Sequence, residues 1–385
     1  MSEYIINMWR NNLTSAYNRL REVEEQTLEE FEDEYEDEYE DGFEDGFEED
    51  MPSTMYNDGQ RLDIQSLTDE MSIHLFRFTY QQIQSVVISM HLTERITCRA
   101  NTSQQFYWDT IEAFAIMLRR LAYPSRLIDL ELLFGISYST ICTIFNEMIV
   151  LLYSKYNEGI RLTRNHLRPY NLRRFSEAII QKGSPYTEVV GFIDGTLNAV
   201  CRPGENQGSV YNGHVRGHGL KYQAVVTPDG ITVSLCGPFA GAIHDMNMLD
   251  SSDIISELDE ILDCEDIGDK FYALYGDPAY RPSSCLIRPF LTGLALTDNQ
   301  RTTNEMMSSV RECVEWEFGH VATLFAFVRY RPGQKVFLSR VGMFYVVSTL
   351  LKNIHTCINN GNQTSFYFGL SPPTLQQYID SITNI

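Results

Sequence analysis

The chain has 385 residues, 43% of them hydrophobic and 12% aromatic, and its formal net charge is −22. This composition excludes a wholly disordered chain, and the length allows two or three globular domains of roughly 100 to 200 residues. The charge alone argues against a nucleic-acid partner, because Lys and Arg normally meet the phosphates. However, residues 22–50 hold 18 Asp or Glu and no Lys or Arg, so residues 51–385 carry only −6. Nucleic-acid binding by the rest of the chain therefore stays open.

The eight cysteines form no CxxC pair, which argues against a thiolate zinc site and a thioredoxin-type motif. We expect reduced cysteines in an intracellular protein. The first residues, MSEYIINMWRNNL, lack the basic and apolar regions of a signal peptide, and no apolar run approaches the ~18 residues that span a bilayer. We therefore expect a soluble protein with no membrane partner, in which the most apolar stretch, GMFYVVSTLL at 342–351, is a buried core helix.

The chain starts with a short segment, 1–21, and an acidic low-complexity segment, 22–50. Aromatic side chains recur in the acidic segment every four residues: Phe31, Tyr35, Tyr39, Phe43 and Phe47. One interpretation is a disordered, self-repelling tail that cannot bury enough apolar surface to fold. The other is an interaction segment whose aromatic side chains anchor it on a basic surface or a partner. Residues 51–72 are predicted to be a linker.

Residues 73–183 are predicted to form a helical region. Apolar residues recur at helical spacing in HLFRFTYQQIQSVVISMHL, FYWDTIEAFAIMLRRLAY, RLIDLELLFG and SYSTICTIFNEMIVLLYSKY. The last two helices are joined by Phe134, Gly135 and Ile136, and Ser137 is placed to cap the second helix, as in a helix-turn-helix. An ordinary helical bundle is the alternative, because the exposed face offers little positive charge. Residues 95–182 nevertheless hold 12 Lys or Arg against 7 Asp or Glu, which favours a phosphate-facing surface.

From about residue 186 the sequence changes to short β-rich runs separated by turns. YTEVVGFID, LKYQAVVT, ITVSLCGP and FYALYGD are predicted strands, and helices are expected from about 304 to 325 and from about 338 to 358. Strands followed by helices indicate an α/β domain with a mixed sheet at 184–330 and a C-terminal helical extension at 331–385.

Three acids occupy positions where a carboxylate is costly unless it is paired or bound to a cation. Asp194 follows the strand VVGFI, Asp277 follows FYALYG, and Glu315 lies in RECVEWEFG on a predicted helix. If that helix crosses the strand ends, the three carboxylates converge. Mg²⁺ relieves the repulsion within such a cluster, and a pair of ions can activate a nucleophile for phosphodiester chemistry.

Longer motifs surround these acids. They are FIDGT at 192–196, YNGHVRGHGLKYQAVVTPDG at 211–230, GPFAGAIHDMNML at 237–249 and YGDPAY at 275–280, followed by Asn304, Ser308, Arg311, Val314, Glu315, Phe318 and Gly319. Over most of residues 73–375 the sequence resembles the DDE nucleases of Harbinger-type transposons, whose N…S..R..VE..FG helix motif fits the last set. The upstream LRRLAYPSRLIDLELLFGISYSTICTIF is similar to the helix-turn-helix segment of that family.

The resemblance implies an RNase H-like fold in which Asp194, Asp277 and Glu315 bind two Mg²⁺ or Mn²⁺ ions. The implied activity is that of a nuclear transposase, a metal-dependent DNA endonuclease and strand transferase that acts on transposon terminal repeats. A Myb-like DNA-binding protein is an implied partner, and oligomerisation is compatible with the family. Two alternatives stay open: a domesticated, non-cutting DNA- or chromatin-binding adaptor, and an RNase H-like nuclease that acts on RNA.

Further residues are candidates for supporting roles. In a continuous helix, Glu312 is rotated 60° from Glu315 and Glu317 about 200°, so Glu317 is expected to be solvated or salt-bridged. The resemblance places His244 and Asp245 near the active site. Candidate phosphate contacts are Arg202, Arg216, Lys221 and Arg281, and Arg311 is a candidate supporting or phosphate-binding residue. A zinc pair of His214 and His218 is disfavoured by the glycines around it, and core packing is expected for His355 and Cys357.

Overall fold

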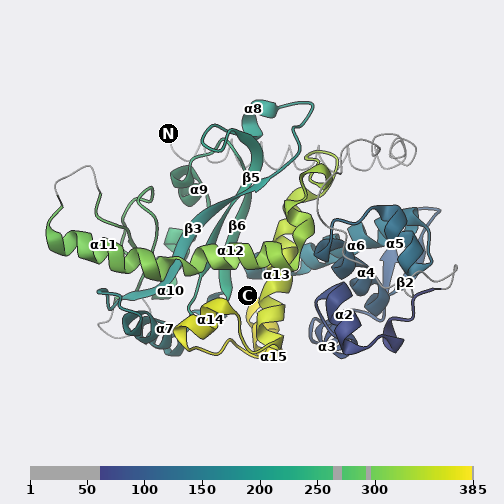
Figure 1. Ribbon diagram of the computed structural model, residues 1–385, viewed down its shortest axis with the longest axis horizontal. Helices are drawn as coiled ribbons and strands as arrows, with labels where there is room; N and C mark the ends of the chain where they lie inside the picture. The colour runs from purple at the N-terminus through teal and green to yellow at the C-terminus, as the bar shows by residue number, and fades with distance from the viewer. Residues whose placement is uncertain (1–60, 263–270, 292–295, 384–385) are drawn as a thin grey trace.

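Figure 1 shows the protein as a computed structural model that describes residues 61–262, 271–291 and 296–383. The predictions for the segments 1–21 and 22–50, and for the first part of the linker, lie outside the described residues. The described chain comprises an N-terminal helical region, a mixed sheet flanked by helices, and a set of C-terminal helices. The predicted α/β class is thereby confirmed.

The N-terminal region is mainly helical, with a small antiparallel pair of strands at its edge. Its elements are α2 (Asp69–Phe76), α3 (Tyr80–Ser89), β1 (Arg95–Cys98), β2 (Phe106–Asp109), α4 (Thr110–Ala122), α5 (Leu127–Phe134), α6 (Tyr138–Arg161) and α7 (Pro169–Gln181). Short 3₁₀ helices lie at Ile64–Ser66 and Arg164–His166 in this region, and at Ala326–Arg329 and Arg331–Gly333 further along the chain.

Two of the predicted helices have different limits, for local reasons. The first is divided into α2 and α3, because Arg77 has a left-handed φ of 69° and Thr79 starts a new helix with a capping box to Gln82. The second loses its first residues, since FYWD pairs with β1 as a strand. Asp109 then caps α4 by accepting a hydrogen bond from the Glu112 amide.

The connection between α5 and α6 has the predicted turn chemistry. Gly135 is the left-handed C-cap of α5, with φ 67°, where glycine is favoured because it has no Cβ. Ser137 caps α6 by accepting a hydrogen bond from the Thr140 amide. The two helix axes differ by 99°, within the range of helix-turn-helix units.

The sheet has six strands, in the order β4-β5-β3-β7-β8, with β6 pairing with β5. The strands are β3 (Val189–Ala199), β4 (Tyr211–Asn212), β5 (Gly217–Val226), β6 (Thr232–Ala240), β7 (Ala273–Tyr275) and β8 (Leu286–Ile287). β3, β5 and β6 pair antiparallel, whereas β7 runs parallel to both β3 and β8. The four predicted strands are thus confirmed as β3, β5, β6 and β7, and the two-residue strands β4 and β8 were not predicted.

Helices cover both faces of this sheet. One face packs against α6 and α13 (Val341–Ile358) in the main hydrophobic cluster, which includes Ile193, Tyr222, Ile144 and Leu350. A second cluster on the other face joins Phe192 to α7, α11 (Asp298–Arg311), α12 (Cys313–Leu324) and α14 (Gln363–Phe368). The remaining helices are α8 (Gln207–Val210), α9 (Asp245–Ser251), α10 (Ile254–Leu262) and α15 (Leu375–Thr383). Because Phe192 and Ile193 face opposite clusters, Asp194 faces the same side as α11 and α12.

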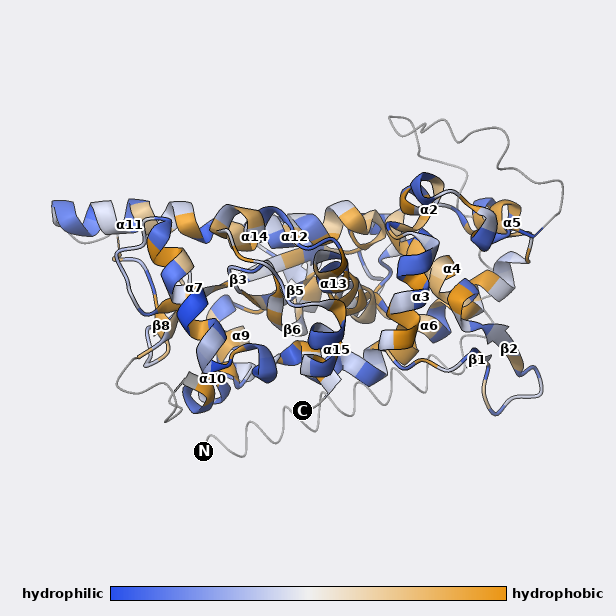
Figure 2. Ribbon diagram, turned by 90° about the horizontal axis from the view of Figure 1, so that it is seen from below, coloured by the Kyte–Doolittle hydropathy of each residue, from blue (hydrophilic) through white to orange (hydrophobic). Residues whose placement is uncertain are grey.

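The helix predicted at 338–358 is α13, and it lies in the core as expected. Its length and composition would suffice for a membrane span, but 78% of it is buried inside the protein, which is typical of a core helix. Figure 2 shows the largely hydrophobic colouring of α13 near the middle of the molecule, whereas the start of α11, at the left end of the view, is hydrophilic. The helix predicted at 304–325 is interrupted at Glu312, so that α11 and α12 meet there.

Candidate active site

Two of the predicted acids lie at the same level of the sheet on neighbouring strands. Asp194, which was predicted to follow the end of a strand, lies within β3, because that strand continues to Ala199 in its pairing with β5, whereas Asp277 lies just past the end of β7. β3 and β7 are parallel, and Phe192 is in register with Tyr275. Asp194 and Asp277 each follow that pair by two residues. Since paired strands are ~4.8 Å apart, the two carboxylates project from adjacent positions. The negative charge of Asp277 accordingly raises the pKa of Asp194, although burial is the larger cause of that shift.

Asp194 is held by a guanidinium and a backbone amide. Arg311 Nη1 lies 2.6 Å from Asp194 Oδ2, and the Gly195 N–H donates to Oδ1 at 2.8 Å. The side chain is only 16% exposed. Burial raises the pKa of Asp194 above its ordinary value, even though Arg311 and the Gly195 amide both act in the opposite direction. This position therefore disfavours the ionised carboxylate even with Arg311 beside it.

Asp277 lies just beyond the end of β7, where the Ala279 N–H donates to its Oδ1 at 2.9 Å. Burial raises the pKa of Asp277, and the negative charge of Asp245 raises it further. The Ala279 amide and Arg311 oppose this shift without cancelling it. Both aspartates are therefore partly buried acids whose charge is incompletely compensated.

Asp245 is a third aspartate of this group. It is the first residue of α9, and its Oδ1 lies 2.9 Å from Lys221 Nζ, which also donates to the Ile243 carbonyl at 2.8 Å. A Cβ placed on Gly195 would lie 3.4 Å from the same oxygen, so Asp245 packs beside the backbone that carries Asp194. Lys221, a predicted phosphate contact, is thus engaged in holding this carboxylate.

Tyr280 and Gln223 lie close to the aspartates, and the sequence alone predicts no role for either. Both side chains are buried, and Gln223 Nε2 donates to the Tyr280 hydroxyl at 3.2 Å. Burial raises the pKa of Tyr280, and the charges of Asp194, Asp277 and Asp245 add to the shift. For Tyr280 the available signal was its place in YGDPAY with Asp277, whereas Gln223 is brought to the site only by the pairing of β5 with β3, which sets it opposite Gly195.

Glu315 reaches the group through Arg311. It lies in the first turn of α12, 64% exposed, with its Oε1 3.7 Å from Arg311 Nη2. One guanidinium therefore stands between Asp194 and Glu315. The structure places Glu315 at the rim of the acidic group rather than in its buried part.

The other glutamates of this segment have separate environments. Glu312 is exposed at the junction of α11 and α12. Glu317 was expected to be solvated or salt-bridged, and it is salt-bridged but 1% exposed, with its Oε2 2.5 Å from Lys352 Nζ. Asn362 and Thr364 donate to its other oxygen at 2.9 and 2.6 Å. This carboxylate therefore belongs to the core and not to the site.

The remaining candidates lie on the exposed surface. His244 is the N-cap residue of α9, and Arg281 lies beside that helix, with its backbone amide 3.1 Å from Met246 Sδ. Arg202 Nε donates to Gln207 at 2.9 Å, and Arg216 occupies a left-handed turn before β5. All four side chains are exposed, so they remain accessible to a ligand.

The other histidine and cysteine candidates have structural surroundings. His214 is exposed, and His218 packs edge-on against Tyr211 at 5.5 Å. His355 contacts the Phe78 ring at 5.4 Å, and Cys357 is 4% exposed, as core packing requires. Among the residues that the structure describes, no group of three or more His, Cys, Asp or Glu is arranged to hold a metal ion.

The donor chemistry of the aspartate group nevertheless suits a hard divalent cation. Its ligands are all carboxylate oxygens, as Mg²⁺ and Mn²⁺ prefer, and the raised pKa values of Asp194 and Asp277 reflect charge that a cation would neutralise. In the present arrangement Arg311 supplies the positive charge at Asp194. These residues therefore fit a metal once the guanidinium moves away from the carboxylate.

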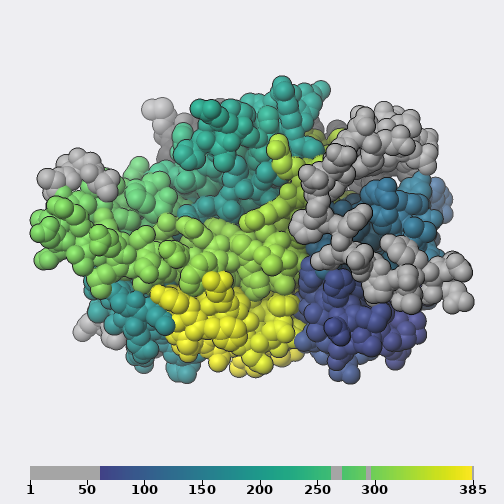
Figure 3. Space-filling model, in the orientation of Figure 1, coloured from purple at the N-terminus to yellow at the C-terminus, as the bar shows by residue number. Residues whose placement is uncertain are grey.

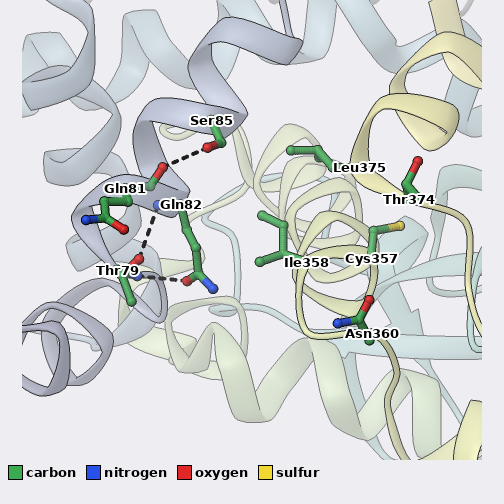
Figure 4. Close-up of a pocket in the computed structure, with 9 residues that line it drawn as sticks. All are labelled: Thr79, Gln81, Gln82, Ser85, Cys357, Ile358, Asn360, Thr374 and Leu375. Atoms are coloured by element: carbon green, nitrogen blue, oxygen red, sulfur yellow. Dashed lines mark hydrogen bonds between the residues drawn. The ribbon is translucent and has the colours of Figure 1, made fainter.

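A pocket of about 490 Å³ lies elsewhere, between α3 and the end of α13 (Figure 4). It is lined by Thr79, Gln81, Gln82, Ser85, Cys357, Ile358, Asn360, Thr374 and Leu375. This lining includes none of the predicted site residues. Its one titratable group is Cys357, whose pKa is raised by burial, so the pocket offers no reactive group comparable to the aspartates.

Comparison with known proteins identifies the sheet and its flanking helices. Residues 193–358 match the family model described as DDE superfamily endonuclease. The matched segment begins one residue before Asp194 and includes Asp277 and Glu315. A DDE superfamily endonuclease domain therefore occupies this part of the chain, and the mixed sheet with flanking helices is consistent with its RNase H-like fold. Neither the curated proteins nor the solved structures include a significant match.

Proposed function

We propose that the protein is a transposase of the Harbinger type, a metal-dependent DNA endonuclease and strand transferase that acts at transposon ends. The observation that carries the proposal is the pair Asp194 and Asp277, which lie at neighbouring positions of the parallel strands β3 and β7, Asp194 within β3 and Asp277 just past β7, and both have raised pKa values. Such a pair inside a DDE endonuclease domain suits phosphodiester chemistry, in which developing negative charge must be stabilised.

Asp194 and Asp277 would hold the divalent cations, with Glu315 completing the set from α12. Bound Mg²⁺ or Mn²⁺ would supply an activated water or 3′-hydroxyl and stabilise the leaving oxygen. The chain's own residues prepare the site: Lys221 fixes the orientation of Asp245, and Arg311 neutralises Asp194 until the cation arrives. Arg311 would then be free to contact a phosphate.

A cleavage assay tests the proposal directly. The full chain is incubated with Mg²⁺ or Mn²⁺ and a duplex that carries the element's terminal repeats. Asp277→Asn and Glu315→Gln should each abolish cutting without lowering the melting temperature. Asp194→Asn should abolish cutting as well, but it also removes the ion pair with Arg311 and should lower the melting temperature. Asp250→Asn is the matched control, because Asp250 is an exposed acid on α9. Cutting that survives Asp277→Asn would overturn the proposed site.

A non-cutting DNA- or chromatin-binding adaptor is the second candidate function. The short ion pair between Arg311 and Asp194 favours it, because a carboxylate that keeps this partner binds metal poorly. The two functions differ in a measurable way. An adaptor would bind DNA but show neither cleavage nor stabilisation by Mg²⁺.

The proposed activity also implies the partners, the location and the oligomeric state of the protein. Its partner would be DNA, with the α5–α6 unit as a helix-turn-helix reader that the 99° helix angle supports. A Myb-like protein would add positive charge for end recognition, and the protein would work in the nucleus, with oligomerisation to pair the two transposon ends. Pull-down of a basic DNA-binding partner and imaging of the tagged chain would test these points.

A further inference from the structure

The positive charge of the helical region is concentrated outside the α5–α6 unit. Residues 161–182 hold six Lys or Arg and one acid, Glu177, whereas residues 95–160 hold equal numbers of basic and acidic residues. The basic segment ends with α7, which covers the same face of the sheet as α11 and α12. Arg161 ends α6 and Arg164 is paired with Glu257 and Glu260, so the positive charge best placed for phosphates lies on α7 and at its two ends.

Aromatic rings accompany the cations on α7. The guanidinium of Arg174 lies 5.5 Å from the Tyr170 ring centre, and Tyr170 is 71% exposed. The ammonium of Lys182 lies 4.6 Å from the ring centre of Tyr367 on α14. Exposed rings paired with cations are the features with which proteins bind unpaired nucleic-acid strands, because bases stack on the rings and phosphates meet the charges.

The two cation–ring pairs lie along α7 and the adjoining C-terminal segment, which leads to α12. Arg174 donates to the Ser371 carbonyl at 3.5 Å, so the segment after α14 lies along α7. Tyr367 in turn packs edge-on against Trp316 at 5.3 Å, and Trp316 follows Glu315 directly. In Figure 3 these elements share one face of the molecule, with the C-terminal segment in yellow between α7 and α12.

We propose that this strip, formed by Tyr170, Arg174, Lys182, Tyr367 and Trp316, binds single-stranded DNA that leads to or from the acidic group. The inference rests on the proposed nuclease function for its direction, because the strip ends one residue from Glu315. A duplex needs only the cations of such a surface, whereas the exposed Tyr170 ring contributes only if a base is free to stack on it. The occupant that uses both features is an unpaired strand.

Binding in the absence of metal tests the strip independently of cleavage. Fluorescence anisotropy is measured for the full chain with labelled poly-dT in EDTA across a salt series. Tyr170→Ala should weaken binding by about fivefold or more, the lower end for one base stacked on an aromatic ring. Lys182→Gln should reduce the slope of log K against log salt by about 0.7, as expected for one lost phosphate contact on a single strand.

Matched controls lie on the distant β1–β2 pair. Tyr107 is a 56% exposed tyrosine on β2, and Arg95 is an exposed arginine on β1. Tyr107→Ala and Arg95→Gln should leave poly-dT affinity within about twofold of wild type. Equal losses in the control and strip variants would overturn the proposal, as would wild-type affinity of Tyr170→Ala at every salt concentration.

The same measurement with a duplex of equal length distinguishes binding of a single strand from binding of double-stranded DNA. If Tyr170→Ala weakens duplex and poly-dT binding equally, the ring does not stack on bases, and the assignment to a single strand is wrong. Loss of poly-dT binding alone supports it. A protein that binds poly-dT through the strip but fails to cut terminal repeats would retain this inference and refute the nuclease, so the two failures are distinguishable.

Discussion

Replacing Arg311 with Gln should destabilise the metal-free protein. Arg311 Nη1 lies 2.6 Å from Asp194 Oδ2, and the two side chains are 21% and 16% exposed. Exposed ion pairs contribute about 0.2–1 kcal/mol, and breaking a buried pair costs about 3–5 kcal/mol. This partly buried pair lies between these limits, so we expect a loss of about 2 kcal/mol. At about 2 °C per kcal/mol for a large chain, the melting temperature should fall by roughly 4 °C.

Magnesium should reverse part of this loss. In Arg311→Gln the Asp194 carboxylate has lost its guanidinium, so a divalent cation no longer competes with it. Saturating Mg²⁺ should then raise the melting temperature of the variant more than that of wild type. Differential scanning fluorimetry with and without Mg²⁺ measures both effects.

Arg301→Gln is the control for this experiment, because Arg301 lies on the same helix and its ion pair with Asp298 is 61% and 97% exposed. Its melting temperature should stay within about a degree of wild type. If Arg311→Gln has the same melting temperature as Arg301→Gln, the ion pair does not stabilise the fold as proposed. If Mg²⁺ raises the melting temperatures of wild type and Arg311→Gln equally, Arg311 does not compete with the cation at Asp194.

Four further outcomes are expected. Because the pKa of Asp277 is raised in the fold, its ionisation destabilises the protein as pH rises; Asp277→Asn should therefore melt higher than wild type at pH 8, and the gap should close towards pH 4. Glu317→Gln should cost about 3 kcal/mol in urea unfolding, and Glu317→Leu combined with Lys352→Met should recover much of it. Burial lowers the pKa of His320 on α12 to about 4, so protonation of this side chain should destabilise the fold as pH falls from 6.5 towards 4. Over that pH range His320→Gln should lose roughly 2 kcal/mol less stability than wild type. Deleting residues 22–50 should tighten nonspecific DNA binding in low salt only, and equal affinities at every salt concentration would favour a partner-recruiting segment.

The strands could be predicted from the sequence because each is a short apolar run bounded by turn residues. VVGFI and FYALY lie just before Asp194 and Asp277, and the structure pairs these two strands in parallel. The first strand was predicted too short, because β3 continues past Asp194 to Ala199. The motifs thus identified the residues, and the sheet supplied their register. Helices whose ends are marked by caps, such as the turn between Gly135 and Ser137, were also predictable.

The pairing between distant segments could not be predicted from the sequence. FYWD has the periodicity of a helix start, and only its pairing with Arg95–Cys98 makes it a strand. Glu317 is polar and was expected near solvent or in a salt bridge, but its buried partner Lys352 is 35 residues away on another helix. The position of Arg311 between Asp194 and Glu315 likewise depends on tertiary packing.

The length of α6 has a consequence for the geometry of DNA recognition. Its 24 residues span about 36 Å, and it packs on α5 and α4 as well as on β6 and α13. One long helix thus extends from the α5–α6 turn to the sheet that carries Asp194. A turn of B-DNA measures about 34 Å, so in a protein that reads DNA at the start of α6 this helix would fix the distance between the bound sequence and the active site. Such a protein would cleave at a fixed number of base pairs from the recognised sequence, and lengthening α6 should shift the cleavage position.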